Sequence, residues 1–318
     1  METEIQVQIV LSIIIPTHNR IDDILENVAC LLPQCEGKPV EIILVDSASD
    51  PAEATRLQVR IAHDDVHLIR VDQPGVSMAR NAGVARARGD WLGFLDDDVL
   101  PNSDWVDAAL ARIRGSDKQD GLIAGRVLPK WPGATAAPTI DPDALGPRAR
   151  GLLSIIDDSR VYCSSNAPVA ISANLLIRKA ALDRVGGFPV HMGRVGTSLA
   201  SGEDPYVVDR IVEAGFQSWY DGALCVQHKI FKNQLTWVWL GRRARQEGLV
   251  SLRKCRTSRQ RLRVATKCIV GLPALAAMTV FAKPKSDYVI RLHHNLGFAQ
   301  GAMVLLLQRK RTGLSRSP

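Results

Sequence analysis

Two kinds of apolar pattern alternate along the first hundred residues. Continuous apolar runs rich in β-branched residues are typical of strands buried in a parallel sheet, whereas apolar residues spaced three and four apart are typical of helices. The second strand follows the first at the spacing of a βαβ unit, which indicates a doubly wound α/β sheet with its ligand site at the carboxyl ends of the strands. Strands are predicted at 9–16, 41–46, 66–72 and 90–98, with helices at 20–32 and 77–89.

The pattern becomes less regular after the next predicted helix. A strand at 121–129 precedes a Pro-, Gly- and Ala-rich stretch at 129–151, which we interpret as an irregular lid or binding loop inside the domain. We expect the completed sheet to be mixed but mostly parallel. The later elements are a strand and a helix within 168–188, a helix that Pro205 opens and Gly215 closes, and a final strand at 217–228.

The chain changes character after residue 230. Residues 242–267 carry ten Lys or Arg against the single acidic residue Glu247, and an apolar segment follows at 268–282. This segment is shorter than the roughly twenty residues of a spanning helix, and Pro273 interrupts it, so an interfacial or re-entrant segment fits better. A second apolar stretch runs into basic residues at 303–311. The alternative is a helical hairpin packed on the α/β part, with a solvated basic face.

Composition limits the class of protein. The 318 residues, 46% of them hydrophobic, can build a large core, and the formal net charge of +7 is concentrated in the C-terminal third. Nucleic acid is not expected as a partner, because aromatic content is 5% and no zinc finger or aromatic RNA-binding pattern accompanies the basic helices. An anionic membrane surface, or a lipid phosphate, better matches basic residues beside apolar segments.

The N-terminus and the cysteines predict a reducing compartment. Residues 1–16 begin acidic and lack the basic region of a signal peptide, so we interpret them as leading into the first strand of a cytosolic fold. The six cysteines form no C-x-x-C pair and are expected to be free thiols. With the basic C-terminal region, this predicts a cytoplasmic protein that is peripheral on the inner face of the membrane.

Polar residues follow the first two predicted strands. Thr17 and Asn19 come after the first and Asp46 after the second, and strand ends of this kind meet at one edge of a parallel sheet. Asp46 can accept hydrogen bonds from a ribose or base, or it can form an ordinary Asx turn. No G-x-G-x-x-G follows the first strand and no G-x-x-x-x-G-K-[ST] occurs, which argues against an NAD enzyme or a P-loop ATPase.

Three consecutive aspartates end the fourth predicted strand. Alternate residues of an extended segment point the same way, so Asp96 and Asp98 can present oxygens to one Mg²⁺ or Mn²⁺ while Asp97 turns away into solvent. Such an ion usually keeps positions for substrate phosphates, which indicates a nucleoside diphosphate as ligand. The alternative is a hydrophilic turn before the next helix.

The helix before this strand carries Arg80 and Asn81. Both can reach the same edge of the sheet, where a guanidinium can bind phosphate or stack on a base. Their alternative is an exposed helix face, since further arginines follow at residues 86 and 88.

A second acidic cluster, Glu203 and Asp204, stands directly before Pro205. An aspartate there is an ordinary N-cap, but the helix dipole also favours an ionised carboxylate, which suits a general base. His228 ends the last predicted strand and is either a third metal ligand or a structural histidine.

Five motifs stand in an order and spacing that resembles glycosyltransferase family 2, whose members have the A-type nucleotide-sugar-binding fold. The resemblance covers roughly residues 10–250, and the set of motifs is specific although each is weak by itself. The second motif departs from the usual VDDGS or VDNGS by lacking the glycine. The motifs are PTHNR, VDSASD, GVSMARNAG, GDWLGFLDDD and SGEDPYVVDRIVEAGF.

The resemblance implies a role for each candidate residue. The reaction it implies moves a sugar from a nucleoside-diphosphate sugar to an acceptor hydroxyl, a glycan or a lipid-linked acceptor, with inversion, in cell-surface polysaccharide or glycolipid synthesis. The implied roles are nucleotide contact for Thr17, Asn19, Asp46, Arg80, Asn81 and Asp96, metal binding for Asp96, Asp98 and His228, and base catalysis for Asp204 with Glu203 beside it.

Two alternatives remain open. A non-catalytic, membrane-associated module could retain nucleotide-sugar binding. A sugar nucleotidyltransferase shares acidic metal ligands, although residues 16–23 lack the Gly-rich basic loop that it would carry. We expect a catalytic domain at 1–230, with a nucleotide-sugar half at 1–110 and an acceptor half at 111–230, and a helical extension at 231–318.

Overall fold

The structure, a computed structural model, places the chain in two compact units. The described residues 131–133 and 140–153 belong to the same unit as the C-terminal helices, whereas the division into a catalytic domain and a helical extension after residue 230 stays a prediction. Unit 1 comprises Met1–Lys130, Ser154–Thr197 and Glu203–Lys229, and unit 2 comprises Trp131–Leu153, Ser198–Gly202 and Ile230–Pro318. The residues described are 8–61, 66–133, 140–164, 170–193, 202–251, 257–281 and 283–313, apart from the side chains of 258 and 304–313.

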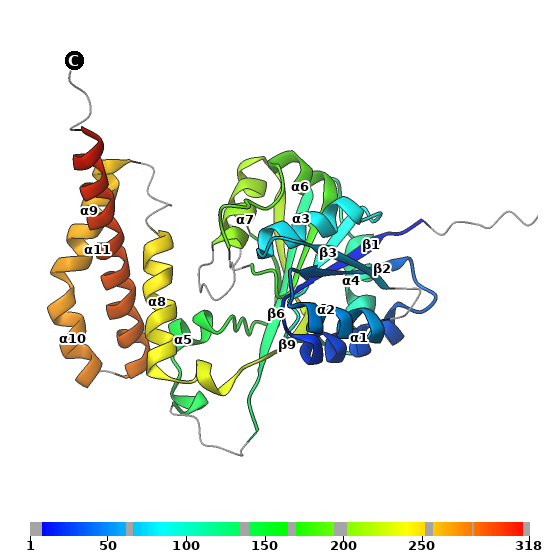
Figure 1. Ribbon diagram of the computed structural model, residues 1–318, viewed down its shortest axis with the longest axis horizontal. Helices are drawn as coiled ribbons and strands as arrows, with labels where there is room; N and C mark the ends of the chain where they lie inside the picture. The colour runs from blue at the N-terminus through cyan, green and yellow to red at the C-terminus, as the bar shows by residue number, and fades with distance from the viewer. Residues whose placement is uncertain are drawn as a thin grey trace, which may run out of the picture. The chain divides into compact units, whose positions relative to one another are not determined.

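Unit 1 alternates strands and helices in its first half and mixes them less regularly in its second half (Figure 1). Its strands are β1 (Leu11–Thr17), β2 (Val40–Ser47), β3 (Val66–Val71), β4 (Trp91–Phe94), β5 (Val99–Pro101), β6 (Asp120–Lys130), β7 (Val161–Ser164), β8 (Leu175–Arg178) and β9 (Gln217–Lys229). Its helices are α1 (Ile21–Cys35), α2 (Pro51–Arg60), α3 (Val76–Arg86), α4 (Trp105–Arg114), α6 (Lys179–Val185) and α7 (Glu203–Glu213).

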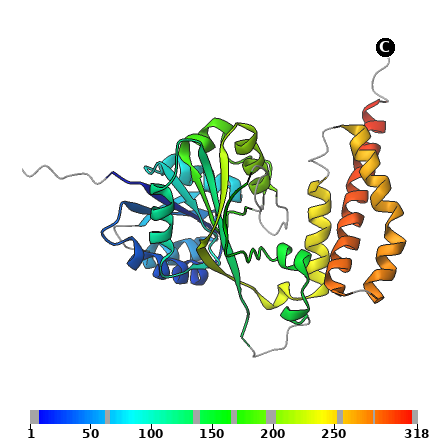
Figure 2. The same ribbon diagram turned by 180° about the vertical axis from the view of Figure 1, so that it is seen from behind.

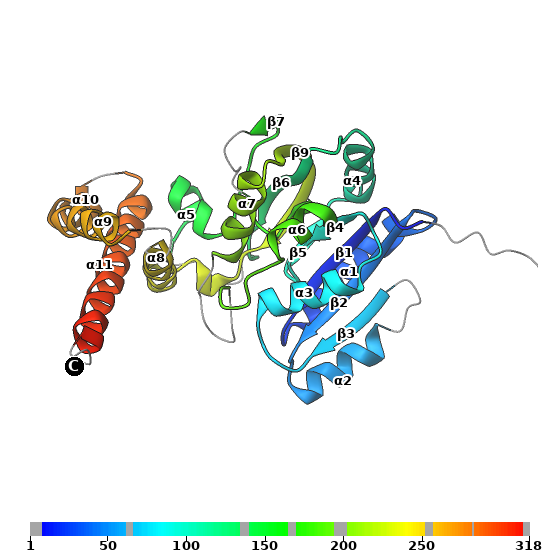
Figure 3. The same ribbon diagram turned by 90° about the horizontal axis from the view of Figure 1, so that it is seen from above.

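These nine strands form one sheet in the order β3-β2-β1-β4-β8-β6-β9-β5, with β7 paired to β9. β3, β2, β1 and β4 are parallel neighbours, and Figure 3 shows the first three side by side. β8 runs antiparallel to β4 and β6, while β6 and β9 are parallel again. The predicted α/β fold with a mixed, mostly parallel sheet is therefore confirmed.

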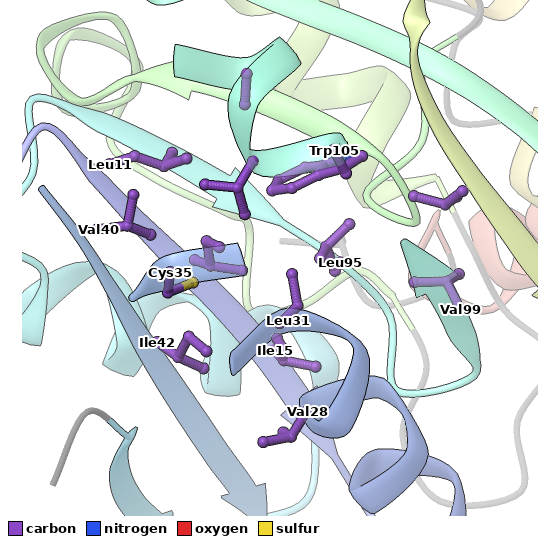
Figure 4. Packing of buried hydrophobic residues seen from close by; sticks show 14 of the residues in the cluster. Leu11, Ile15, Val28, Leu31, Cys35, Val40, Ile42, Leu95, Val99 and Trp105 are labelled. Carbon is purple, nitrogen blue, oxygen red and sulfur yellow. The ribbon is translucent and has the colours of Figure 1, made fainter. Parts of the chain in front are cut away.

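Helices lie on both faces of this sheet (Figure 2). Successive side chains of a strand point to opposite faces, so Ile13 and Ile15 of β1 join the core beside α1 and α4, whereas Ile14 joins the core beside α3, α6 and α7. Figure 4 shows Val28 and Leu31 of α1 in the same core cluster as Ile15. Both faces are covered by apolar cores, which explains why Ile13–Ile15 of β1 and Ile42–Val45 of β2 are apolar at every position.

Gly83 lets α3 lie close to the sheet. A Cβ at this position would lie 2.5 Å from Ile14 Cγ2 and 3.3 Å from Val45 Cγ2, closer than packed carbon atoms normally approach. We predict that Gly83→Ala lowers the free energy of unfolding by about 1–3 kcal/mol, measured by urea denaturation. Gly151→Ala is the control, because its Cβ would meet nothing described within 4 Å. An equal loss in both variants would contradict this explanation.

Unit 2 is helical. Two glycines allow α8 and α11 to pack closely. A Cβ at Gly248 would collide with the carbonyl oxygen of His294, and a Cβ at Gly297 would collide with the carbonyl oxygen of Arg245. α9 and α10 also contact α11. The helices are α5 (Pro147–Leu152), α8 (Trp237–Ser251), α9 (Ser258–Val270), α10 (Leu272–Phe281) and α11 (Lys285–Gly313), with 3₁₀ turns at Pro142–Ala144 and Lys232–Gln234.

The stretch predicted to be an irregular loop is partly helical. Pro147 opens α5, and Asp287 of α11 accepts hydrogen bonds from the backbone nitrogens of Arg148 (3.0 Å) and Ala149 (3.3 Å). Asp287 therefore satisfies amide groups at the start of α5 that would otherwise lack a partner in the helix. The prediction of an irregular loop is therefore wrong for residues 140–152, its role as a lid or binding loop stays a prediction, and residues 134–139 lie outside the described residues.

No helix within the described ranges is by itself long and apolar enough to cross a membrane. The segments Arg259–Val270 and Leu272–Phe281 of α9 and α10 meet that test together by length and composition, but they join at a bend of 43°. The predicted apolar segment 268–282 covers this join, and its last residue lies outside the described residues. The second predicted apolar stretch, 303–311, belongs to α11.

Candidate active site

The carboxyl ends of β1, β2 and β3 bring three polar residues into one row. Thr17 is opposite Asp46 in the register of β1 and β2, and Asp46 is opposite Arg70 in the register of β2 and β3. The buried carboxylate of Asp46 accepts a hydrogen bond from the backbone nitrogen of Ser49 (3.0 Å) and forms an ion pair with Arg70. Thr17 and Asp46, both predicted to contact a nucleotide, are therefore neighbours in the sheet.

Asn19 fastens the turn after β1 to the turn after β2. It adopts a left-handed backbone conformation, with φ at 55°, which asparagine tolerates better than most residues. Its backbone nitrogen donates to Ser49 Oγ (2.9 Å), and its side-chain oxygen accepts from the backbone nitrogen of Asp50 (2.8 Å). Ala48 also has φ at 55°. In VDSASD, alanine thus takes the left-handed position that glycine would take in the usual motif.

The three aspartates do not lie on an extended segment, which corrects the prediction of a strand over 90–98. β4 ends at Phe94, and the backbone nitrogen of Val99 donates to the carbonyl of Asp96 (3.4 Å) across a turn. The side-chain amide of Asn27 on α1 donates to the carbonyls of Asp96 (3.2 Å) and Val99 (2.8 Å). The turn sends the side chains of Asp96 and Asp98 to different partners.

Asp97 is buried, so the prediction that it turns into solvent is wrong. Its carboxylate accepts hydrogen bonds from Thr17 Oγ1 (2.8 Å) and from the guanidinium of Arg20 (3.0 Å). These donors replace the water that a buried carboxylate loses. Burial raises the pKa of Asp97 to about 7, and the charge of Asp98 acts in the same direction.

Asp98 is also buried and lies between two basic side chains. Its Oδ2 lies 2.5 Å from Arg20 Nη1, and its Oδ1 lies 3.3 Å from His228 Nε2. The pairing of β5 with β9 creates this contact, because Val99 is opposite His228 and the backbone nitrogen of Lys229 donates to the Asp98 carbonyl (2.9 Å). Burial favours a higher pKa, but the charges and hydrogen bonds of His228 and Arg20 hold the pKa of Asp98 below its usual range.

Arg80 joins three carboxylates that come from two parts of the chain. Its side chain is 3% exposed, and its two terminal nitrogens each lie 3.1 Å from their partners, Asp96 on one side and Glu203 and Asp204 on the other. Burial opposes the charge of Arg80, but the carboxylates of Asp204, Asp96 and Glu203 raise its pKa above the usual value. The alternative that Arg80 lies on an exposed helix face is therefore wrong. Its Nη1 and Nη2 donate to protein carboxylates.

Two carboxylates form the first turn of α7, which begins two residues earlier than predicted. Asp204 Oδ2 accepts from the backbone nitrogen of Ser172 (2.9 Å), while Oδ1 accepts from the Ser172 hydroxyl and from Arg80. Burial raises the pKa of Glu203, the charge of Asp204 adds to this effect, and Arg80 offsets part of it. The Asp204 side chain is 14% exposed against 7% for Glu203, so Asp204 is the more accessible of the two.

Asn81 connects α3 with the loop after α6. Its side-chain amide donates to the carbonyl of Phe188 (2.8 Å), and its side-chain oxygen accepts from the backbone nitrogen of the same residue (2.9 Å). Both ends of the amide are therefore used to hold the loop after α6. That Asn81 contacts the nucleotide stays a prediction.

The residues predicted to bind metal fit a hard divalent cation by their chemistry. Asp96 and Asp98 offer the carboxylate oxygens that Mg²⁺ and Mn²⁺ prefer, and His228 offers an imidazole nitrogen, a ligand that suits Mn²⁺ better than Mg²⁺. Asp98 and His228 already converge, whereas Asp96 is bonded to Arg80. Across the described part of the chain, no three such side chains are grouped as a complete metal site. The Asp98 and His228 pair is therefore the preformed part of the candidate site.

Residues 12–186, more than half of the chain, match the family model described as Glycosyl transferase family 2. The chain belongs to glycosyltransferase family 2. The predicted resemblance is thereby confirmed, and the matched range contains the strand ends, Arg80 and the three aspartates. It ends before α7, so the family match does not test the roles of Glu203, Asp204 and His228.

Curated relatives of this family 2 chain are glycosyltransferases and glycan biosynthesis proteins. Glycosyltransferase AglE of Haloferax volcanii is 30% identical over 210 residues, which are 65% of this chain and 62% of AglE. A pre-mycofactocin glycosyltransferase of Mycobacterium tuberculosis is 28% identical over 74% of this chain and 45% of its own length. The chain thus spans less than two thirds of these two relatives. The succinoglycan biosynthesis protein ExoM of Rhizobium meliloti is 23% identical over 85% of both chains.

A solved structure supports the family 2 fold. The mannosyltransferase PcManGT from Pyrobaculum calidifontis is similar over 92% of this chain and 86% of its own, with a TM-score of 0.60 and 17% sequence identity. At this identity the likeness concerns the fold, and it confirms the predicted A-type glycosyltransferase architecture.

Among the site residues that were not singled out from the sequence are Arg20, Arg70 and Ser172. Arg20 ends the PTHNR motif, and its place directly after the first strand was a usable signal. Arg70 is a charged residue near the end of an apolar strand, which is a weaker signal. Ser172 bonds Asp204 from 32 residues away, and no local pattern marks it.

Proposed function

We propose that this protein transfers a sugar from a nucleoside-diphosphate sugar to an acceptor hydroxyl, with inversion at the anomeric carbon. The observation that carries the proposal is the Arg80 cluster, in which Asp96 and Asp204 bond to the same guanidinium. Asp96 would face the diphosphate of the donor and Asp204 would face the acceptor, so both sides of the reaction would meet at the Arg80 guanidinium. The reacting carbon would lie near this cluster.

The donor would bind along the carboxyl ends of the strands. We assign its nucleoside to the row formed by Thr17, Asp46 and Arg70, with Asn19 shaping the adjoining turn. Carboxylate and guanidinium side by side offer both an acceptor and a donor to a base or ribose. The PcManGT structure was determined in complex with GDP-Man and Mn²⁺, and this supports a nucleotide-sugar donor and a divalent metal here.

Asp96, Asp98 and His228 would hold the Mg²⁺ or Mn²⁺. The bound ion would act as a Lewis acid and stabilise the negative charge of the departing nucleoside diphosphate. This chain's own contribution is to fix Asp98, whose carboxylate contacts His228 and whose carbonyl accepts from the Lys229 backbone. Asn27 fixes the same turn from the α1 side.

Asp204 would act as the general base. Ser172 and Arg80 hold both of its oxygens, so the carboxylate is oriented before an acceptor hydroxyl arrives. The hydroxyl would transfer its proton to Asp204 while its oxygen attacks the anomeric carbon from the side opposite the diphosphate. A single displacement of this kind inverts the configuration. Glu203, the less exposed neighbour, would help to hold Arg80.

We propose that the acceptor is part of a cell-surface polysaccharide or glycolipid and that the protein works at the cytoplasmic face of the membrane. Residues 248–286 contain nine Lys or Arg and no Asp or Glu. On α9, the exposed residues Arg259, Arg263 and Lys267 repeat every four positions and share one face. Large exposed apolar side chains accompany them, which suits an anionic lipid surface. These are Leu262, Ile269, Val270, Val280 and Phe281.

We predict that Arg259→Gln, Arg263→Gln and Lys267→Gln together weaken binding to phosphatidylglycerol vesicles about a hundredfold, since each basic residue at such a surface contributes about 1 kcal/mol. Sedimentation with vesicles of increasing phosphatidylglycerol content measures this. The control makes the same change at three exposed arginines of unit 1, Arg60, Arg114 and Arg184. An equal loss in the control, or equal binding to neutral vesicles, would contradict the assignment of α9.

The transfer proposal is tested with a labelled nucleotide sugar and membrane lipid extract as the source of acceptor. We expect labelled sugar to become glycosidically linked to an acceptor, with the configuration opposite to that in the donor, read by proton NMR. A product with retained configuration would contradict the single displacement by Asp204.

A further inference from the structure

Arg20 places a positive charge on the carboxylate that the proposed metal needs. Its Nη1 lies 2.5 Å from Asp98 Oδ2 and 3.0 Å from Asp97 Oδ1, so one nitrogen bridges two buried carboxylates. The turn after β1 determines where the Arg20 backbone lies, because Asn19 is held by Ser49 and Arg20 follows it directly before α1. The Arg20 side chain therefore starts within reach of both carboxylates.

A divalent ion and Arg20 compete for Asp98. Mg²⁺ binds a carboxylate oxygen at about 2.1 Å, so an ion on Oδ2 would share that oxygen with Arg20 Nη1, which lies 2.5 Å away, and the two positive charges would repel each other. An ion on Oδ1, beside His228, would still be repelled by the charge of Arg20 across one carboxylate. The Arg20 side chain is 34% exposed, which leaves it a path toward solvent.

The donor diphosphate offers Arg20 another partner. Guanidinium groups form strong, charge-assisted hydrogen bonds with phosphate oxygens, and the diphosphate would bind next to the metal. We propose that Arg20 is a positioning residue that competes with the divalent cation for Asp98 and gives way to it when the donor diphosphate binds. Metal and nucleotide then bind cooperatively. This role rests on the proposed function, because it requires a metal at Asp98 and a nucleoside diphosphate beside it.

Binding of Mn²⁺ without turnover tests the role of Arg20. The electron paramagnetic resonance signal of free Mn²⁺ gives the Kd for the full-length protein, with and without UDP, GDP or dTDP. In the wild type we expect one nucleotide to tighten Mn²⁺ binding about tenfold or more. Arg20→Gln should bind Mn²⁺ about tenfold more tightly than the wild type without nucleotide. The tightening caused by the nucleotide should shrink by the same factor, because Arg20 has already left Asp98 in the nucleotide-bound wild type, which should then bind Mn²⁺ as the variant does.

Two variants serve as controls. Arg20→Lys keeps the charge and should resemble the wild type without nucleotide. Arg56→Gln removes the same charge from an exposed arginine of α2 and should change neither Kd, which separates local competition from the overall field of the protein. Thermal unfolding of each variant shows that it is folded.

The outcomes separate this role from the proposed function. If the wild type shows cooperative binding but Arg20→Gln binds Mn²⁺ no more tightly than the wild type without nucleotide, the role of Arg20 is overturned and the metal site stands. If the wild type binds no Mn²⁺ with any of the three nucleotides, the metal site and the role of Arg20 are both overturned.

Discussion

Asp204→Asn is expected to lower the rate of sugar transfer about a hundred- to ten-thousand-fold, the range that a general base typically contributes. Asparagine keeps the shape of the side chain, and its Oδ1 can still accept from the Ser172 hydroxyl and from Arg80. Its amide cannot take the proton of the acceptor. Donor binding should change much less, because the residues assigned to the nucleoside lie at the ends of β1, β2 and β3. Initial rates and calorimetric Kd values for the donor measure the two effects.

Asp209→Asn provides the matched control for Asp204. Asp209 is exposed and lies on the same helix, α7, so its replacement makes the same chemical change away from the Arg80 cluster. We expect wild-type rates. If Asp204→Asn retains a rate within a few-fold of the wild type, another group removes the proton and the assignment of Asp204 fails.

Asp98→Asn is expected to remove most metal binding, and turnover with it. An amide has the shape of the carboxylate but lacks its charge, so the affinity for Mn²⁺ should fall about a hundredfold or more and transfer should fall to the level seen with a chelator. Arg20 keeps a partner in Asp97, which limits the structural damage. Mn²⁺ titration and initial rates at increasing Mn²⁺ measure the change.

Asp72→Asn is the control for Asp98, because Asp72 is an exposed carboxylate directly after β3. This variant tests whether the loss of any negative charge near the strand ends weakens Mn²⁺ binding as much as Asp98→Asn does. We expect a Kd for Mn²⁺ within about twofold of the wild type. Unchanged Mn²⁺ affinity in Asp98→Asn itself would contradict the assignment of the metal to this turn.

The first part of the sheet could be predicted because its signals are local. β1 and β2 are buried on both faces, so every position from Leu11 to Ile15 is apolar or small, and the carboxyl ends of parallel strands necessarily share one edge. Placing Thr17 and Asp46 at a common edge therefore required only the strand assignments. Their register opposite one another followed from the structure.

The aspartate turn could not be predicted because its geometry depends on distant residues. Asn27 holds the turn from 69 and 72 residues away, and His228 reaches Asp98 through the pairing of β5 with β9. The sequence pattern from Asp90 to Asp98 resembles one continuous strand, and nothing local shows that the strand ends at Phe94. The contacts that Asp96 and Asp98 make with Arg80, Arg20 and His228 could not be predicted for the same reason.

The same limit explains the error at residues 140–152. Proline, glycine and alanine suggested an irregular loop, but the amide groups at the start of α5 bond to Asp287, about 140 residues later in the chain. Composition describes the local backbone preference and carries no information on a partner so distant. Conversely, Gly83 follows Arg80 by one helical turn, and only the approach of α3 to Ile14 shows why that position lacks a side chain.

The release of nucleoside diphosphate from a panel of UDP-, GDP- and dTDP-sugars tests the account most directly. The panel is run with Mg²⁺, with Mn²⁺ and with chelator, in the presence and absence of membrane lipid extract. We predict that the wild type and Asp209→Asn release one of the three nucleoside diphosphates in a metal-dependent manner, and that this release is lost in Asp204→Asn and Asp98→Asn. Tight binding of a nucleotide sugar with no release under any of these conditions would contradict the transferase and favour a non-catalytic binding module.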